Sequence, residues 1–106
     1  MNPIVVLTTA DSLELAQQIA TALVQAGEAG CVSIVPGIHS VYRWEGEVCN
    51  AGELLLVIKS TAERYEEVRS RIRQLHSYQV PEVIALPITA ADPDYLRWLS
   101  QVTSDE

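Results

Sequence analysis

Residues 31–44 read CVSIVPGIHSVYRW, a run dense in the β-branched and aromatic residues that favour strands. The run has 14 residues, more than twice the usual strand length of about 5–6 residues. Residues Trp44–Glu47 are typical of a turn, and a second strand-like run follows and ends near Lys59. Fourteen extended residues would reach about 46 Å, whereas a domain of about 100 residues has a radius of gyration of about 13 Å. The sequence therefore predicts a β-hairpin that curls strongly or projects beyond its own domain.

Two features of this hairpin bear on its purpose. Pro36-Gly37 predicts a bend, because proline removes a ladder donor and glycine tolerates a bulge. On the return strand, residues Leu54–Ile58 are apolar without a break. A bare apolar edge invites uncontrolled pairing, and another copy of the same chain is the economical cover for it. We therefore interpret the hairpin as an oligomerisation element within a closed assembly.

The chain before the hairpin contains one strand signal and one helix signal. Ile4–Leu7 is a short apolar run that is typical of a buried central strand. A helix is expected next, with Asp11 and Glu14 as a capping box at its start. Gly27 follows the last apolar residue of that periodic stretch and is expected to stop the helix.

The chain after the hairpin supplies a helix, a strand and a last helix. Ser60 and Glu63 form a second capping-box pattern before an apolar stripe. Residues Val80–Ile88 are expected to form a strand with its two prolines at an edge or a bend, and Asp92 is an N-cap before a first-turn proline. The order βαββαβ plus a C-terminal helix predicts an α+β, ferredoxin-like fold in a single domain over residues 1–106.

Composition limits the classes of partner. The net charge of −7 repels phosphate backbones and attracts cations, so nucleic acid is not an expected partner. The longest apolar runs fall far short of the roughly 20 residues that a membrane-spanning helix needs. The N-terminus has no basic signal-peptide region, and the two cysteines make no disulfide framework, so a cytoplasmic protein is expected.

Several blocks of the sequence resemble one known family. Cys31–Ile38 and Ser40–Gly46 resemble the signature of the CutA family of divalent-cation-tolerance proteins. Glu53–Ser60, Leu75–Ile88 and Asp94–Leu99 resemble its later blocks. This resemblance implies a homotrimer of ferredoxin-like subunits, similar in architecture to the PII signalling proteins. It also implies a link to the tolerance of copper and other divalent metals.

The predicted metal ligands are Cys31, His76 and Glu82. Thiolate and imidazole suit copper, so weak binding of Cu²⁺ or another divalent metal is expected, with copper preferred over zinc. The chain has Gln79 where the family commonly has a glutamate, and that change removes one charged oxygen ligand. The structural alternatives are that Cys31 is a buried strand residue and that His76 only complements a helix C-terminus.

A second predicted site is a ligand cleft between subunits. Its expected residues are Tyr42, Trp44, Lys59, Tyr78 and Gln79. The aromatic residues would serve equally well as anchors of an interface. Lys59 is the only lysine of the chain, and it is expected to meet Glu53, Glu82 or a ligand anion.

No motif of a known enzyme class occurs in the sequence, neither GxSxG nor HExxH nor a phosphate-binding glycine loop. The predicted function is therefore a small homotrimeric protein of divalent-cation tolerance that binds metal or regulates rather than catalyses. Two alternatives stay open: a PII-like sensor of a small anionic metabolite, and a small enzyme with an active site between subunits.

Overall fold

The computed structural model describes residues 2–104. In chain order its elements are β1 (Pro3–Ala10), α1 (Leu13–Gln25), β2 (Cys31–Trp44), β3 (Glu47–Thr61), the 3₁₀ helix η1 (Ala62–Arg64), α2 (Tyr65–Leu75), β4 (Ile84–Pro87) and α3 (Pro93–Val102). This succession confirms the predicted βαββαβ order and the final helix.

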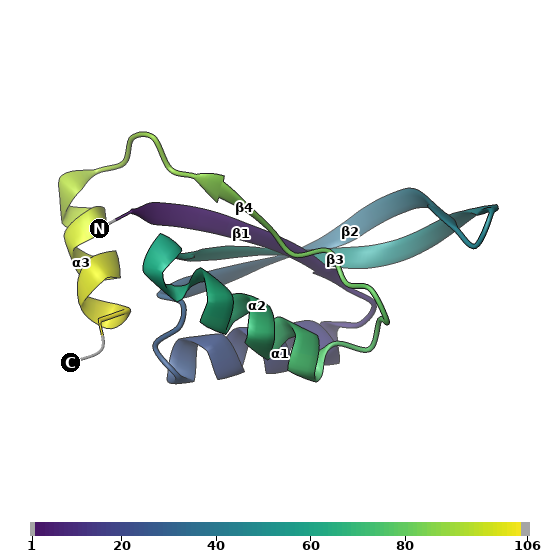
Figure 1. Ribbon diagram of the computed structural model, residues 1–106, viewed down its shortest axis with the longest axis horizontal. Helices are drawn as coiled ribbons and strands as arrows, with labels where there is room; N and C mark the ends of the chain where they lie inside the picture. Colours follow the sequence, from purple (N-terminus) through teal and green to yellow (C-terminus); the bar gives the residue numbers. More distant parts are fainter. Residues whose placement is uncertain (1, 105–106) are drawn as a thin grey trace.

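The strands form one antiparallel sheet in the order β2-β3-β1-β4, so the predicted central position of β1 is confirmed. Helices α1 and α2 lie on one face of the sheet (Figure 1). Along β1 the residues alternate between half-buried and buried, because successive side chains point to opposite faces. The core lies between the sheet and these helices and is fully buried at Val6, Ile19, Leu23, Leu56, Ile58, Val68 and Ile72.

The hairpin of β2 and β3 is as long as the sequence predicts. Its pairing runs from Cys31 opposite Lys59 to Trp44 opposite Glu47, with a register shift between Val35 and Ile38. Residues 38–53, which we call the arm, lead beyond the helices (Figure 1). The subunit measures 44 × 25 × 22 Å as a result.

Glycines at the bend and at the tip carry the backbone angles that shape this hairpin. Gly37 has φ +79° inside the register shift, which confirms the predicted bend. At the tip, Glu45 and Gly46 have φ of 52° and 82°. Two consecutive residues with positive φ are typical of the tight turn that matches the twist of antiparallel strands.

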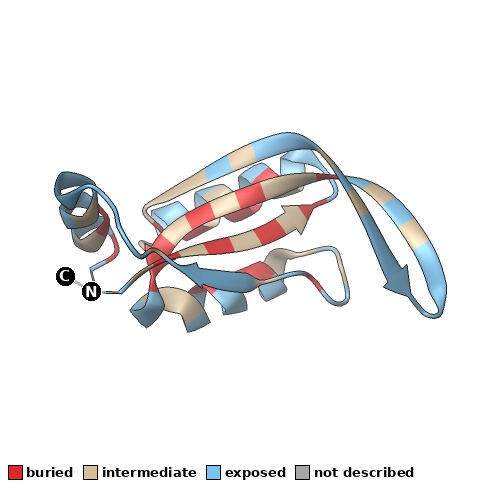
Figure 2. Cartoon of the chain, turned by 90° about the horizontal axis from the view of Figure 1, so that it is seen from above, coloured by how far each residue is buried: buried red, intermediate tan, exposed pale blue. Residues whose placement is uncertain are grey.

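The face of the sheet opposite α1 and α2, which we call the open face, is apolar. Figure 2 looks onto this face, and α3 lies at one end of the sheet. Ile84 and Leu86 of the edge strand β4 are each 49% exposed. The other apolar side chains of this face are half-buried at Val5, Leu7, Leu55 and Val57.

Both capping-box predictions are wrong in detail. Ser12, not Asp11, is the N-cap of α1, and its Oγ accepts a hydrogen bond from the Leu15 amide at 3.1 Å. Ser60 is fully buried within β3, where its Oγ donates to the Glu28 carbonyl at 2.6 Å. The serine hydroxyl therefore closes a tertiary contact between β3 and the segment after α1 instead of starting a helix.

Two strand boundaries also differ from the prediction. β4 covers only Ile84–Pro87 rather than residues 80–88. Pro81 has no amide to donate, and the Val83 carbonyl accepts a hydrogen bond from the Tyr65 hydroxyl at 3.4 Å. β3 continues past Lys59 to Thr61, where its pairing with Pro3 of β1 ends.

α3 begins as predicted and packs at one end of the sheet. The Asp92 carboxylate accepts hydrogen bonds from the amides of Asp94 and Tyr95. Gly30 lies so close that a Cβ there would be 2.6 Å from Leu99 Cδ1. None of the helices within residues 2–104 combines the length and the apolarity that crossing a membrane requires.

The bend can be tested by a matched pair of glycine substitutions. An added Cβ would meet nothing within 4 Å at either Gly37 or Gly52, but only Gly37 has a positive φ. Gly37→Ala should lower the free energy of unfolding by about 1–2 kcal/mol, the cost of the left-handed conformation for a residue with a Cβ. Gly52→Ala should lower it far less. Urea unfolding at one fixed protein concentration measures both, and equal losses would contradict the assigned role of Gly37.

Candidate functional site

Glu53 is the centre of the most developed polar site in the structure. It lies on β3 at the base of the arm and is only 7% exposed. The Tyr78 hydroxyl donates a hydrogen bond to Glu53 Oε2 at 2.7 Å. Burial opposes ionisation, but the hydroxyls of Ser40, Tyr78 and Thr9 outweigh it and hold the pKa of Glu53 below its usual value. Glu53 is thus a buried carboxylate that stays ionised.

His76 fastens the chain after α2 to the sheet. Its Nδ1 accepts a hydrogen bond from the Tyr78 amide at 3.0 Å, and its Nε2 lies 2.6 Å from the Thr9 carbonyl oxygen. Since Nδ1 is the acceptor, the ring proton lies on Nε2 and is donated to Thr9. Both ring nitrogens are therefore engaged inside the subunit, and a metal at either one would have to displace a hydrogen bond.

Tyr78 is held between these two residues. Its ring centroid is 4.6 Å from that of His76. Burial raises the pKa of Tyr78, and the hydrogen bond to Glu53 and the charges of Glu53 and Asp11 raise it further. The phenol consequently remains a donor to Glu53 at physiological pH. Ser77 donates to Asp11 at 3.3 Å, so this end of the sheet carries two acids.

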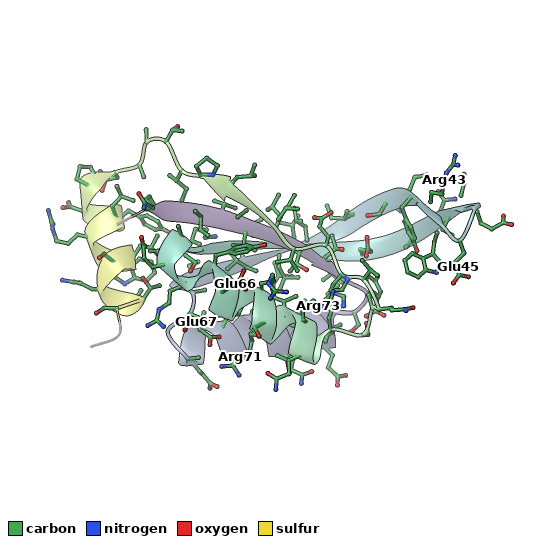
Figure 3. The ribbon with its side chains drawn as sticks, in the orientation of Figure 1. Arg43, Glu45, Glu66, Glu67, Arg71 and Arg73 are labelled. Atoms are coloured by element: carbon green, nitrogen blue, oxygen red, sulfur yellow. The ribbon has the colours of Figure 1, made fainter. Side chains whose placement is uncertain are left out.

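The structure brings together only part of the predicted ligand cleft. Tyr42, on the arm, is near enough to Tyr78 to act on its pKa. Gln79 is exposed next to Tyr78. Trp44 lies at the far end of the arm and is 40% exposed; Figure 3 shows its neighbours Arg43 and Glu45 there.

Lys59 lies apart from the other predicted cleft residues. Its Nζ donates to Ser33 Oγ at 2.8 Å and to the Val57 carbonyl at 3.2 Å. Glu53 is six residues away on the same strand, a distance of about 20 Å. The predicted pairing of Lys59 with Glu53 or Glu82 is therefore not formed within the subunit.

The predicted metal ligands do not converge in one subunit. Cys31 is half-buried at the start of β2, opposite Lys59. Burial raises the pKa of Tyr95 on α3, and the nearby Cys31 raises it further. His76 contacts Thr9, whose β3 partner is Leu55. Lys59 and Leu55 are four residues apart on β3, or about 13 Å. In addition, β3 lies between the strand of Cys31 and the strand of Thr9, so Cys31 and His76 are separated across the sheet as well as along it.

Glu82 is exposed in the loop before β4. Within residues 2–104, no three His, Cys, Asp or Glu side chains are grouped so as to hold a metal ion. The donors of a single subunit thus do not fit a metal centre.

A groove opens beside Glu53 at the base of the arm. Its volume is about 590 Å³, and it is lined by Leu13 and Gln17 of α1 and by residues 34, 36–39 and 52–54 of the hairpin. Ligand pockets in proteins typically have volumes of about 300–1,000 Å³. The lining is mostly apolar, with His39 and Glu53 as its titratable side chains.

The sequence prediction treated Glu53 only as a partner for Lys59 and missed its central place. One signal was available: Glu53 is the acid that directly precedes the apolar run Leu54–Ile58. If that run forms a buried strand, the acid at its start is expected to be buried as well. Thr9 and Ser40 carry no comparable signal. Their approach to Glu53 depends on how β1, β2 and β3 align.

Comparison with known proteins assigns the family. A model of the CutA1 divalent ion tolerance protein family matches residues 4–102. The chain belongs to the CutA family. Its sequence is 48% identical over 99 residues to the divalent-cation tolerance protein CutA of Thermus thermophilus, covering 93% of this chain and 96% of that one. The solved structure of the Thermus thermophilus protein has a TM-score of 0.94 and covers 96% of this chain and 99% of its own.

Other CutA relatives differ in length and in described location. The chain is 46% identical to the chloroplastic CutA of Arabidopsis thaliana over 94% of this chain, but it spans only 55% of that protein. A CutA structure from Archaeoglobus fulgidus, described as periplasmic, is 34% identical with a TM-score of 0.94, covering 96% of this chain and 99% of that one.

The acid sensitivity of folding tests the state of Glu53. Its pKa in the folded protein lies below the ordinary value of 4.5. Ionised Glu53 therefore contributes stability above that pH, and the contribution is lost as the pH falls through the lower folded-state pKa. Glu53→Gln should flatten this acid limb. Urea unfolding from about pH 3 to pH 7 at fixed protein concentration measures the difference, with Glu45→Gln in the exposed turn as the control. Parallel profiles for wild type and Glu53→Gln would contradict the assignment.

Proposed function

We propose that this CutA protein is a homotrimer that serves divalent-cation tolerance by binding at sites between its subunits, and that it is not a catalyst. The observation that carries the proposal is the buried, ionised Glu53 with Tyr78 and His76 beside an uncovered apolar sheet face. A polar site beside an uncovered apolar face suits a cleft that a neighbouring subunit completes.

The assembly is supported by the open face and the arm. Leu86 and Ile84 are each about half exposed, and Val41 and Val48 on the arm are 68% and 66% exposed. Apolar surface of this extent is stabilised when it is removed from water, by about 25 cal/mol per Å². Three is the number of subunits that the family resemblance implies, and a closed ring leaves no arm unpaired.

Metal binding in this proposal depends on the charge of the trimer and on ligands from more than one subunit. Three subunits of −7 carry −21 in total, and such a field concentrates cations around the protein. Cys31, His76 and Glu82 can share a metal only across subunits, and His76 must first give up a hydrogen bond. We therefore expect modest affinity, with Cu²⁺ preferred over Zn²⁺.

A cytoplasmic location is part of the proposal, and a PII-like sensor of a small anionic metabolite is the alternative function. Lys59 favours the sensor, because no carboxylate in the described chain lies within 4 Å of its Nζ. A small anion bound between subunits would supply the missing charge. The acidic net charge of the chain favours cations over anions as the main ligands.

The oligomeric state is the first test. Light scattering on a sizing column should give three times the subunit mass of 11.7 kDa. Leu86→Asp on the open face should dissociate the trimer, because a carboxylate buried without a partner is strongly unfavourable. Val24→Asp is the matched control, since Val24 is similarly exposed, at 44%, but lies on α1. A monomeric wild type would exclude the assembly, and equal effects of the two substitutions would exclude the open face as its interface.

Copper calorimetry tests the metal proposal. Cys31→Ser and His76→Ala should each weaken Cu²⁺ binding, while Cys49→Ser on the arm should leave it unchanged. Equal binding by all four proteins would show that the metal is not held by Cys31 and His76.

A further inference from the structure

Two charged side chains on the open face lack an oppositely charged partner within residues 2–104. Glu53 is 7% exposed and forms no ion pair, and Lys59 is half-buried and forms none. The other charged residues of this range that are not exposed are paired: Arg71 with Glu28 at 3.0 Å and Arg64 with Glu67 at 2.6 Å. Glu53 and Lys59 are therefore the two charged residues, among those that are not exposed in residues 2–104, that form no ion pair within a single chain.

Hydrogen-bonding capacity is left over on both groups. A carboxylate accepts up to about four hydrogen bonds and an ammonium donates three. The hydroxyls of Tyr78, Ser40 and Thr9 use three of the acceptor positions of Glu53. Two of the three Lys59 donors are used, by Ser33 and by the Val57 carbonyl. An assembly that covers the open face would strip the remaining water from both charges. That loss is costly unless each charge meets the other.

The positions of the two residues exclude pairing inside one subunit and suit pairing between subunits. Residues 53 and 59 are both odd-numbered on β3 and so point to the same face of the sheet. They lie about 20 Å apart along the strand. In a closed ring the contacts are head to tail, so the Lys59 end of one subunit can meet the Glu53 end of the next.

We propose that Lys59 of each subunit forms an ion pair with Glu53 of the neighbouring subunit, so that the Glu53 site is complete only in the ring. This inference rests on the proposed trimer and adds to it a specific contact and a direction. The contact supplies the one positive charge that the acidic end around Glu53 and Asp11 lacks. Because Lys59 is the only lysine of the chain, no other ammonium group can take its place. A two-fold contact could hold the same pair twice, since residue i then meets residue j and j meets i, so the subunit number is measured separately by light scattering.

A double-mutant cycle tests the pair. Lys59→Met, Glu53→Gln and the double variant are compared with wild type by light scattering over a dilution series. Each single substitution should raise the concentration at which half of the protein is trimeric by about tenfold. In the double variant this concentration should be no higher than in the single variant that assembles less well, because the effects of two interacting residues do not add. Arg97→Met with Asp94→Asn is the control cycle, because this exposed pair lies within α3; it should leave the trimer unchanged.

Two restoration experiments keep the test decisive if a single variant folds poorly. The charge swap Lys59→Glu with Glu53→Lys should restore a trimer that Lys59→Glu alone has lost. Lys59→Ala should regain assembly in n-butylammonium chloride, which supplies the missing ammonium group, but not in sodium chloride of equal concentration. Failure of both restorations would overturn the pairing.

The outcomes separate the pairing from the assembly. A trimeric wild type with additive losses in the cycle would overturn the Lys59–Glu53 pair alone. A monomeric wild type would overturn the trimer, and the pair with it. If wild type binds succinate and Lys59→Met loses that binding while remaining a trimer of unchanged affinity, then Lys59 holds a small anion instead, and the pairing is overturned.

Discussion

The pairing of β2 with β3 is the constraint on which the rest of this structure depends. It continues to the Trp44–Glu47 turn, beyond the two helices that cover the sheet, so part of the hairpin has no intramolecular cover. The same strand β3 contributes Leu56 and Ile58 to the core and Glu53 and Lys59 to the open face. Core, arm and candidate site are therefore consequences of one long ladder, and a shift of register by one residue would exchange its two faces.

The electrostatics of the open face explain how the carboxylate of Glu53 can be both buried and ionised. A carboxylate at 7% exposure is tolerated only because hydroxyl groups from two neighbouring strands and a loop converge on it. Such groups rigidify a site when satisfied and destabilise it when one is missing. His76 serves this arrangement by fixing the segment that carries Tyr78. Both ring nitrogens of His76 are used in these hydrogen bonds, and one of the bonds would have to break before His76 could ligate a metal.

Two predictions from local sequence were wrong because the residues concerned make tertiary contacts instead. Ser60 has the residue type and spacing of a helix cap, yet its hydroxyl is taken by the Glu28 carbonyl in the interior. Residues 80–83 have strand-like composition, but the Val83 carbonyl accepts a hydrogen bond from the Tyr65 hydroxyl at 3.4 Å, and pairing with β1 begins only at Ile84. Hydrogen bonds from a side chain to backbone that is far away in the chain leave no periodic pattern in the sequence, so they cannot be predicted from it.

The sequence by itself determined the order of the elements, the length of the hairpin, its bend at Pro36-Gly37 and the α+β class, because periodicity, turn residues and chain length act locally. It also carried the family, through motifs that span nearly the whole chain. Only the tertiary structure decided which of the candidate residues meet. Cys31 and His76 fall at different ends of the sheet, and Glu53 meets Thr9, Ser40 and Tyr78. That outcome depends on strand register and on a loop contact, which are fixed by packing between segments far apart in the chain and not by any residue alone.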